Sequence, residues 1–178
     1  RYTYVARLER IVQDVLGVAK DPKSAREAAR LEEIVEDCLS LLEQRLAEQA
    51  IALDLRLGAG APVRVHVAQM KQAVLNVLNN AIEAMPHGGT LLVRVEADPD
   101  AIGLSVQDSG PGIPQELRGK VFQPFFTTKE RGTGLGLTLA QKILRGDGGS
   151  VEIREAPGGG AEVCLRLPRA GRPERGVP

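Results

Sequence analysis

The chain has 178 residues, enough for one domain with a substantial hydrophobic core and a short appendage. Its 23 basic residues balance its 23 acidic residues and it has no tryptophan, which argues against a nucleic-acid binder or a protein that lies on a membrane surface. No apolar run approaches the roughly 18 residues of a membrane-spanning helix, and no secretory signal is recognisable. We therefore expect a cytoplasmic chain that makes no direct membrane contact and binds no nucleic acid.

The two cysteines and the first residue bear on the cellular context. Cys38 and Cys164 match no metal-binding or redox spacing, so we expect both to pack as ordinary side chains in a reducing compartment. The chain begins at Arg1 without a methionine. We therefore expect a piece of a longer protein, and any membrane anchor of that protein would lie outside this chain.

Two helices are predicted before the first strand. Residues 1–19 carry apolar side chains at helical spacing and end before Asp21-Pro22, because proline cannot continue a helix. A second amphipathic helix is predicted from about residue 30 to residue 48.

Strands and helices then follow in a mixed order. Strands are predicted at 51–57, 63–67, 90–97, 102–107, 150–155 and 162–167, and helices at 70–85 and 135–144. The segment 109–133 is rich in Gly, Pro and Thr and too long for a simple connection, which is typical of a functional loop. The polar tail 169–178 is expected to be disordered. This order predicts an α+β domain, a mixed sheet with helices on one face, preceded by one amphipathic helix.

The predicted helix 70–85 carries the strongest functional signal. It holds Asn76, Asn79 and Asn80, although each asparagine costs roughly 0.6 kcal/mol in a helix relative to alanine. Asn76, Asn80 and Glu83 follow one another at helical spacing and share a stripe, while a second, apolar stripe can enter the core. Amide and carboxylate oxygens are the ligands that a hard cation carrying a phosphate requires. Asn79 points off this stripe, and we predict no function for it.

Two glycine-containing segments can approach a ligand closely. Asp108-Ser-Gly-Pro-Gly112 follows a strand, so a carboxylate that can accept hydrogen bonds from an amine stands beside two small residues; ordinary turn chemistry is the alternative. Gly132-Thr-Gly-Leu-Gly-Leu137 precedes a helix whose first N–H groups can bind phosphate, the alternative being a flexible hinge. The second segment is neither a P-loop nor a dinucleotide fingerprint, since it lacks the Gly-Lys-Ser/Thr of the one and the third glycine of the other.

The order of these motifs resembles that of the N, G1, F and G2 boxes of sensor histidine kinases. The matching segments are Asn76-Val-Leu-Asn-Asn80-Ala-Ile-Glu83, Asp108-Ser-Gly-Pro-Gly112, Phe122-Gln-Pro-Phe-Phe-Thr-Thr-Lys129 and Gly132–Leu137. The resemblance covers about residues 1–168 and implies the Bergerat-type ATP-binding fold, a two-layer α/β sandwich shared with type II topoisomerases and mismatch-repair ATPases. It also implies that residues 1–20 are the second helix of a dimerisation and phosphoacceptor hairpin, and that 24–168 form the catalytic domain.

The resemblance implies a site for ATP and Mg²⁺. Asn80 is implied as the Mg²⁺ ligand, Asn76 as its partner near the phosphates and Lys129 as a third catalytic residue. Asp108 would read the adenine amino group. The segment 114–131 would be the mobile ATP lid, anchored by Phe122, Phe125 and Phe126. The other expected contacts to the nucleotide are Glu83, Gly110, Gly112, Ile113, Arg131, Gly132, Thr133, Gly134, Leu135, Gly136 and Leu137.

Asn76 also bears on the type of reaction. Hydrolysing relatives place at this position a Glu that activates water, whereas an amide is no effective general base at neutral pH. This favours phosphoryl transfer to a protein side chain, although Glu83 could still polarise a water. The chain departs from the family at Glu83, where many members place a Lys, and at Ala161, where a Thr often supports the adenine-reading Asp. If Lys129 or Arg131 supplies the missing positive charge, phosphate binding survives.

The phosphoacceptor of the family is a His in a His-Glu motif, and neither His66 nor His87 has that context. We expect the chain to bind ATP and to phosphorylate a His outside itself, on the hairpin helix of a homodimeric kinase, for relay to an Asp of a response regulator. Two alternatives stay open: a Bergerat-type ATPase that drives conformational change, and a nucleotide-gated protein-binding regulator.

Overall fold

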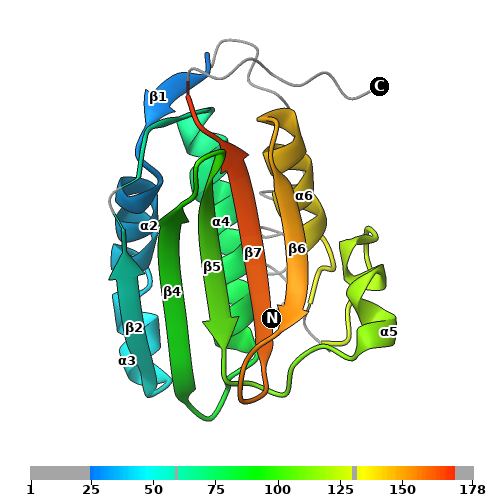
Figure 1. Ribbon diagram of the computed structural model, residues 1–178. Helices are drawn as coiled ribbons and strands as arrows, with labels where there is room; N and C mark the ends of the chain where they lie inside the picture. The colour runs from blue at the N-terminus through cyan, green and yellow to red at the C-terminus, as the bar shows by residue number, and fades with distance from the viewer. Residues whose placement is uncertain (1–24, 59, 130–131, 171–178) are drawn as a thin grey trace, which may run out of the picture.

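The computed structural model describes residues 25–58, 60–129 and 132–170. The expected helix 1–19 and the expected lid residue Arg131 lie outside these ranges. The chain forms a five-stranded mixed sheet in the order β2-β4-β5-β7-β6, with its helices packed on one face (Figure 1). The predicted two-layer α+β architecture is confirmed.

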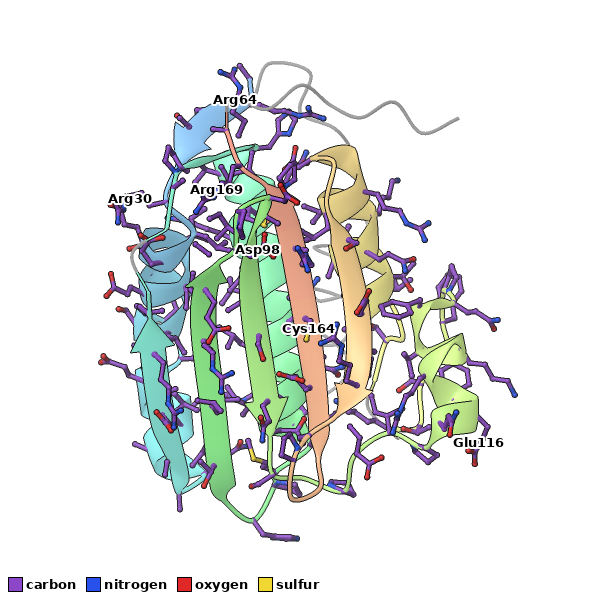
Figure 2. All side chains as sticks on the ribbon, viewed as in Figure 1. Arg30, Arg64, Asp98, Glu116, Cys164 and Arg169 are labelled. Carbon is purple, nitrogen blue, oxygen red and sulfur yellow. The ribbon has the colours of Figure 1, made fainter. Side chains whose placement is uncertain are left out.

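The sheet is built from β2 (Ile51–Leu57), β4 (Gly89–Ala97), β5 (Ala101–Asp108), β6 (Ser150–Glu155) and β7 (Ala161–Pro168). Strand β2 pairs parallel to β4 and every other neighbouring pair is antiparallel. Side chains alternate along β5 and β7 between the buried helix-covered face and a polar open face. Cys164 lies on the open face, half-buried in the middle of β7 (Figure 2).

The covering layer consists of α2 (Leu31–Ser40), α3 (Glu43–Glu48), α4 (Val67–Glu83) and α6 (Gly136–Gly146). Helix α4 lies in the middle of this layer and packs against α2 and α6. Its core stripe includes Met70, Val74, Val77, Leu78 and Ile82, all shielded from solvent, so the opposite stripe with the asparagines is left facing outward.

Several element boundaries differ from the sequence prediction. The helix expected at 30–48 breaks at Leu41 and Leu42, where the Leu42 amide bonds to the Leu39 carbonyl three residues back and tightens the turn. The strand expected at 63–67 ends after Val65, so His66 is the residue before helix α4 and not a strand residue. Residues 169 and 170 of the expected tail contact the rest of the fold, since Arg169 bridges to Val63 and the Ala170 amide donates to the Pro62 carbonyl, and residues 171–178 lie outside the described ranges.

Three short elements were not predicted. Strand β1 (Glu27–Ala29) pairs antiparallel with β3 (Val63–Val65) beside the main sheet. Within the expected lid, the chain forms the short helix α5 (Gln115–Arg118) and the 3₁₀ turn η1 (Lys120–Phe122), which lie beside α6 (Figure 1). These two short elements close one side of the cavity described next.

Candidate functional site

A cavity of about 600 Å³ lies between α4, the end of β5, the lid segment and the start of α6. The predicted site residues that line it are Asn76, Asn80, Glu83, Asp108, Gly112, Ile113, Lys129, Gly132, Thr133, Gly134, Gly136 and Leu137. Its size suits a nucleotide-sized ligand, and it brings together all four sequence motifs.

Asp108 forms the buried polar end of the cavity. Only 5% of the residue is exposed, and its Oδ1 accepts hydrogen bonds from the Gly110 amide at 2.9 Å and the Ala161 amide at 3.2 Å. Burial raises the pKa of this carboxyl, while the two backbone hydrogen bonds and the charge of Lys129 oppose the shift. A carboxylate held in this way, with an oxygen facing an apolar pocket, can read an amino group on a flat ring.

Close backbone contacts fix the walls around Asp108. A Cβ added to Gly160 would overlap the Asp108 carbonyl oxygen, and one added to Gly110 would come within 2.7 Å of the Ala84 carbonyl oxygen. Gly112 has φ of +75° and faces the Gly160 backbone. Gly110 therefore supports Asp108 from behind and does not itself line the cavity.

Another wall of the cavity, called its cation end below, carries positive and polar groups. The Lys129 Nζ donates hydrogen bonds to Asn80 Oδ1 at 2.6 Å and to the Asn80 carbonyl at 3.3 Å, and it lies 3.1 Å from Glu83 Oε2. Two residues of the stripe predicted from helical spacing, Asn80 and Glu83, thus contact the same cation. A chain position 46 residues away supplies it, which spacing alone could not show.

The start of α6 forms the third wall. Asn76 Nδ2 donates to the Gly136 carbonyl at 3.2 Å, so the first asparagine ties α4 to the first turn of α6. That turn has no acidic residue, which leaves the positive end of the helix dipole available to an anion. Gly134, with φ of +69°, packs against the Phe125 backbone and anchors the lid segment there. Leu135 is the residue before the helix and does not line the cavity.

Two residues at this site were missed from the sequence. Asn79 lines the cavity and accepts a hydrogen bond from the Arg45 guanidinium at 2.5 Å. Arg45 lies on α3 and also stands 3.9 Å from Glu83. No local motif marks Arg45, since its partners are 34 and 38 residues further along the chain.

The residues present fit a Mg²⁺ ion bound together with phosphates. Asn80 already directs its side-chain oxygen and its carbonyl oxygen at the Lys129 ammonium, which stands where a cation would bind. Among the described residues no cluster of three or more His, Cys, Asp or Glu side chains could hold a metal alone. A magnesium ion here would therefore take most of its ligands from phosphate and water, as Mg²⁺ usually does.

Comparison with known proteins identifies the family and the fold. Residues 65–171 match the model of the family described as histidine kinase-, DNA gyrase B- and HSP90-like ATPase. The chain is 34% identical over 165 residues to sporulation kinase E of Bacillus subtilis and 33% identical over 168 residues to sensor histidine kinase ZraS of Klebsiella oxytoca. These matches cover 91% and 93% of this chain but only 22% and 36% of the relatives, so the chain spans a minor part of their length.

Solved structures agree. The catalytic domain of histidine kinase ThkA superposes with a TM-score of 0.76 at 31% identity, covering 81% of this chain and 95% of that domain. ThkA in complex with the response regulator TrrA gives a TM-score of 0.81 at 28% identity over 97% of this chain and 50% of that one. The chain therefore belongs to the histidine kinase-, DNA gyrase B- and HSP90-like ATPase family. Within this family, the similarity to the ThkA catalytic domain and to sporulation kinase E shows that the chain is a histidine kinase catalytic domain, which binds ATP. No helix in the described part of the chain is long and apolar enough to cross a membrane.

Proposed function

We propose that this domain transfers the γ-phosphoryl group of Mg²⁺-bound ATP to a histidine outside the chain, in a cytoplasmic signalling kinase that passes it to an aspartate of a response regulator. The observation that carries the proposal is the polarity of the cavity. A buried carboxylate lines the cavity at the end of β5, and Lys129, Asn80 and the start of α6 line it separately as its cation end.

The nucleotide is oriented by this polarity. Asp108 accepts a hydrogen bond from the adenine amino group, and the phosphates lie toward Lys129 and the first turn of α6, where positive charge and helix amides meet them. A bound Mg²⁺ supplies charge neutralisation of the phosphates. Asn80 holds it, and Asn76 holds the α6 turn in place through its bond to Gly136. Positioning and charge stabilisation are the main contributions of protein groups to phosphoryl transfer.

Transfer is favoured over hydrolysis for a reason visible in the site. The carboxylate nearest to the cation end is that of Glu83, and it accepts a hydrogen bond from Lys129 and faces Arg45. A carboxylate held by a cation is a poor general base for water, and Arg45 can hold Glu83 in this way whatever Lys129 contacts. The acceptor is a separate histidine because neither His66 nor His87 lines the cavity, and His66 is hydrogen-bonded to Asp147 on another part of the fold.

The test supplies the acceptor in trans. The chain, ATP labelled at the γ-phosphate and Mg²⁺ are mixed with the full-length gene product whose own site carries Asp108→Asn. We expect acid-labile, alkali-stable label on the gene product only when the chain is present, and no stable label on the chain, because Asp108→Asn weakens ATP binding at the gene product's own site without abolishing it. Multiple-turnover release of phosphate at a rate unaffected by the gene product would instead support the ATPase alternative. If ATP tightened the complex between the two without any label transfer, a nucleotide-gated binding module would be the better description.

A further inference from the structure

At the cation end of the cavity, Arg45 lies behind two of the residues that line it. Arg45, on α3, donates through Nη1 to Asn79 Oδ1 at 2.5 Å, and its Nη2 stands 3.9 Å from Glu83 Oε1. Arg45 does not line the cavity, whereas Asn79 and Glu83 both do. A side chain outside the pocket thus contacts two residues that shape its phosphate end.

The negative charge of Glu83 explains why a cation is needed behind the wall of the cavity. Its carboxylate lies one helical turn from Asn80, in a pocket that accepts a polyanion, and like charges at short range repel. In the structure Lys129 offsets this charge, through an ion pair at 3.1 Å. Yet Lys129 belongs to the lid segment and is also the described cation best placed to meet phosphates. One cation would therefore have to serve two anions once a nucleotide is bound.

Arg45 supplies a second cation, and it lies on helix α3 and not on the lid segment. The next residue along α3, Leu46, is buried in the core, which fixes the helix. The planar guanidinium has several N–H groups in a rigid fork, so one can bond Asn79 while another faces Glu83. Asn79, which the sequence left without a function, holds that fork in place.

We propose that Arg45 is a positioning residue for nucleotide binding: it keeps the Glu83 carboxylate compensated, so that Lys129 is free to leave Glu83 and meet the phosphates. The inference rests on the proposed function in one respect, the orientation of the nucleotide with its phosphates toward Lys129. It assigns to Arg45 and Asn79 a role that acts through Glu83 and not through direct contact with the ligand.

A double-mutant cycle tests the proposal by equilibrium binding alone. Affinity for Mg²⁺-ATP is measured by titration calorimetry for the wild-type chain, Arg45→Gln, Glu83→Gln and the double variant. We expect Arg45→Gln to weaken binding about fivefold, the scale of one partly exposed ion pair. Glu83→Gln should bind at least as tightly as wild type, and the double variant should match Glu83→Gln within about twofold.

Two further variants distinguish the geometry of the guanidinium from its charge and control for the removal of a positive charge. Arg45→Lys retains the charge but loses the fork, so its affinity should fall between those of wild type and Arg45→Gln. Arg56→Gln is the matched control, because Arg56 is an exposed arginine on β2 paired with Asp54. It removes the same charge and should leave affinity unchanged, and thermal unfolding of each variant checks that the fold persists.

The outcomes separate this inference from the proposed function. A wild-type chain that binds no Mg²⁺-ATP would overturn both together. Normal binding by Arg45→Gln would overturn the inference alone. An affinity loss in Arg45→Gln that persists undiminished in the Glu83→Gln background would also overturn it, since Arg45 would then act on the fold or on the general field and not through Glu83.

Discussion

The ammonium of Lys129 lies 2.6 Å from the side-chain oxygen of Asn80, so the lid segment places a cation on the expected metal ligand. Lys129 comes from the loop after η1 and Asn80 from the middle of the helical layer, and their contact closes the phosphate end of the cavity. This contact places the Lys129 ammonium where a metal ion would bind, and among the described lysines and arginines Lys129 is the one that lines the cavity.

Replacing Lys129 by Met should weaken Mg²⁺-ATP binding by about tenfold, since a charge-assisted hydrogen bond to phosphate is lost. Lys129→Arg should recover part of the loss because it keeps the charge. Lys120→Met is the control, an exposed lysine on η1 that does not line the cavity. Equal affinities of Lys129→Met and Lys120→Met, measured by calorimetry, would remove Lys129 from the site.

Asp108→Asn should separate stability from function. The raised pKa of the buried carboxyl means that the folded state binds a proton more readily than the unfolded state. The charge therefore costs stability as pH rises above the ordinary value of 3.8 and through the folded pKa. An asparagine oxygen can still accept from Gly110 and Ala161 without that cost.

We accordingly expect Asp108→Asn to unfold at the same or a higher temperature at pH 7, with the difference from wild type shrinking toward pH 4. Its ATP affinity should fall about tenfold or more, because the amide presents a donor or a weaker acceptor to the adenine amino group. Thermal scans across pH and calorimetric titration check the two halves. A variant that is less stable than wild type at pH 7 would contradict the first half.

The spacing of residues along the sequence predicted correctly those site residues that lie together on one helix. The spacing of Asn76, Asn80 and Glu83 placed them on one stripe of α4, and the structure has them on one wall of the cavity. The same spacing separated Asn79 from them, and its partner proved to be Arg45 on another helix. Contacts between distant segments depend on how helices pack, and a single sequence carries no direct signal for that.

Propensity also failed where tertiary pairing decided the outcome. Strand β1 has the sequence Glu-Ala-Ala, which favours helix, yet it pairs with β3 and is therefore extended. The break at Leu41 and Leu42 was missed because the residues around it are good helix formers with unbroken apolar spacing. The strands predicted at 102–107 and 162–167 agree with β5 and β7 to within one residue at each end, since alternation depends only on neighbouring residues.

Gly160→Ala should destabilise the domain and disturb the pocket. Gly160 has φ of +88°, and its added Cβ would overlap the Asp108 carbonyl oxygen. Left-handed strain of about 1 kcal/mol would be joined by displacement of the β5 end, for a total loss above about 2 kcal/mol and weaker ATP binding.

Gly158→Ala provides the matched control. Gly158 lies in the same turn with φ of +92°, but nothing lies within 4 Å of its added Cβ. It should lose only the conformational part, with ATP affinity unchanged. Urea unfolding and calorimetry compare the two, and equal losses would show that the contact with Asp108 is unimportant.

An exchange of His66 and Asp147 should be tolerated although each single change is not. Asp147, which is buried, accepts from the His66 amide and its Oδ1 lies 3.0 Å from His66 Nδ1 and 3.1 Å from Arg26 Nε. His66 precedes the first turn of α4 and Asp147 follows the last turn of α6. An anion is unfavourable after a helix C-terminus and a histidine supplies no side-chain cap here, so each helix end has the less suitable partner.

His66→Asp alone sets two carboxylates against each other, and Asp147→His alone leaves Arg26 and the His66 amide without this acceptor. Each should cost about 2 kcal/mol, by the usual scale for a broken buried polar contact. In the double exchange the pair is restored, aspartate can cap α4 and histidine follows α6, so most of the lost stability should return, the contact between Arg26 and Asp147 being the part that does not. Urea unfolding of all four proteins gives the coupling energy directly. If the two single losses simply added in the double variant, the His66–Asp147 contact would contribute nothing and the joint between β3, α4 and α6 would rest on apolar packing.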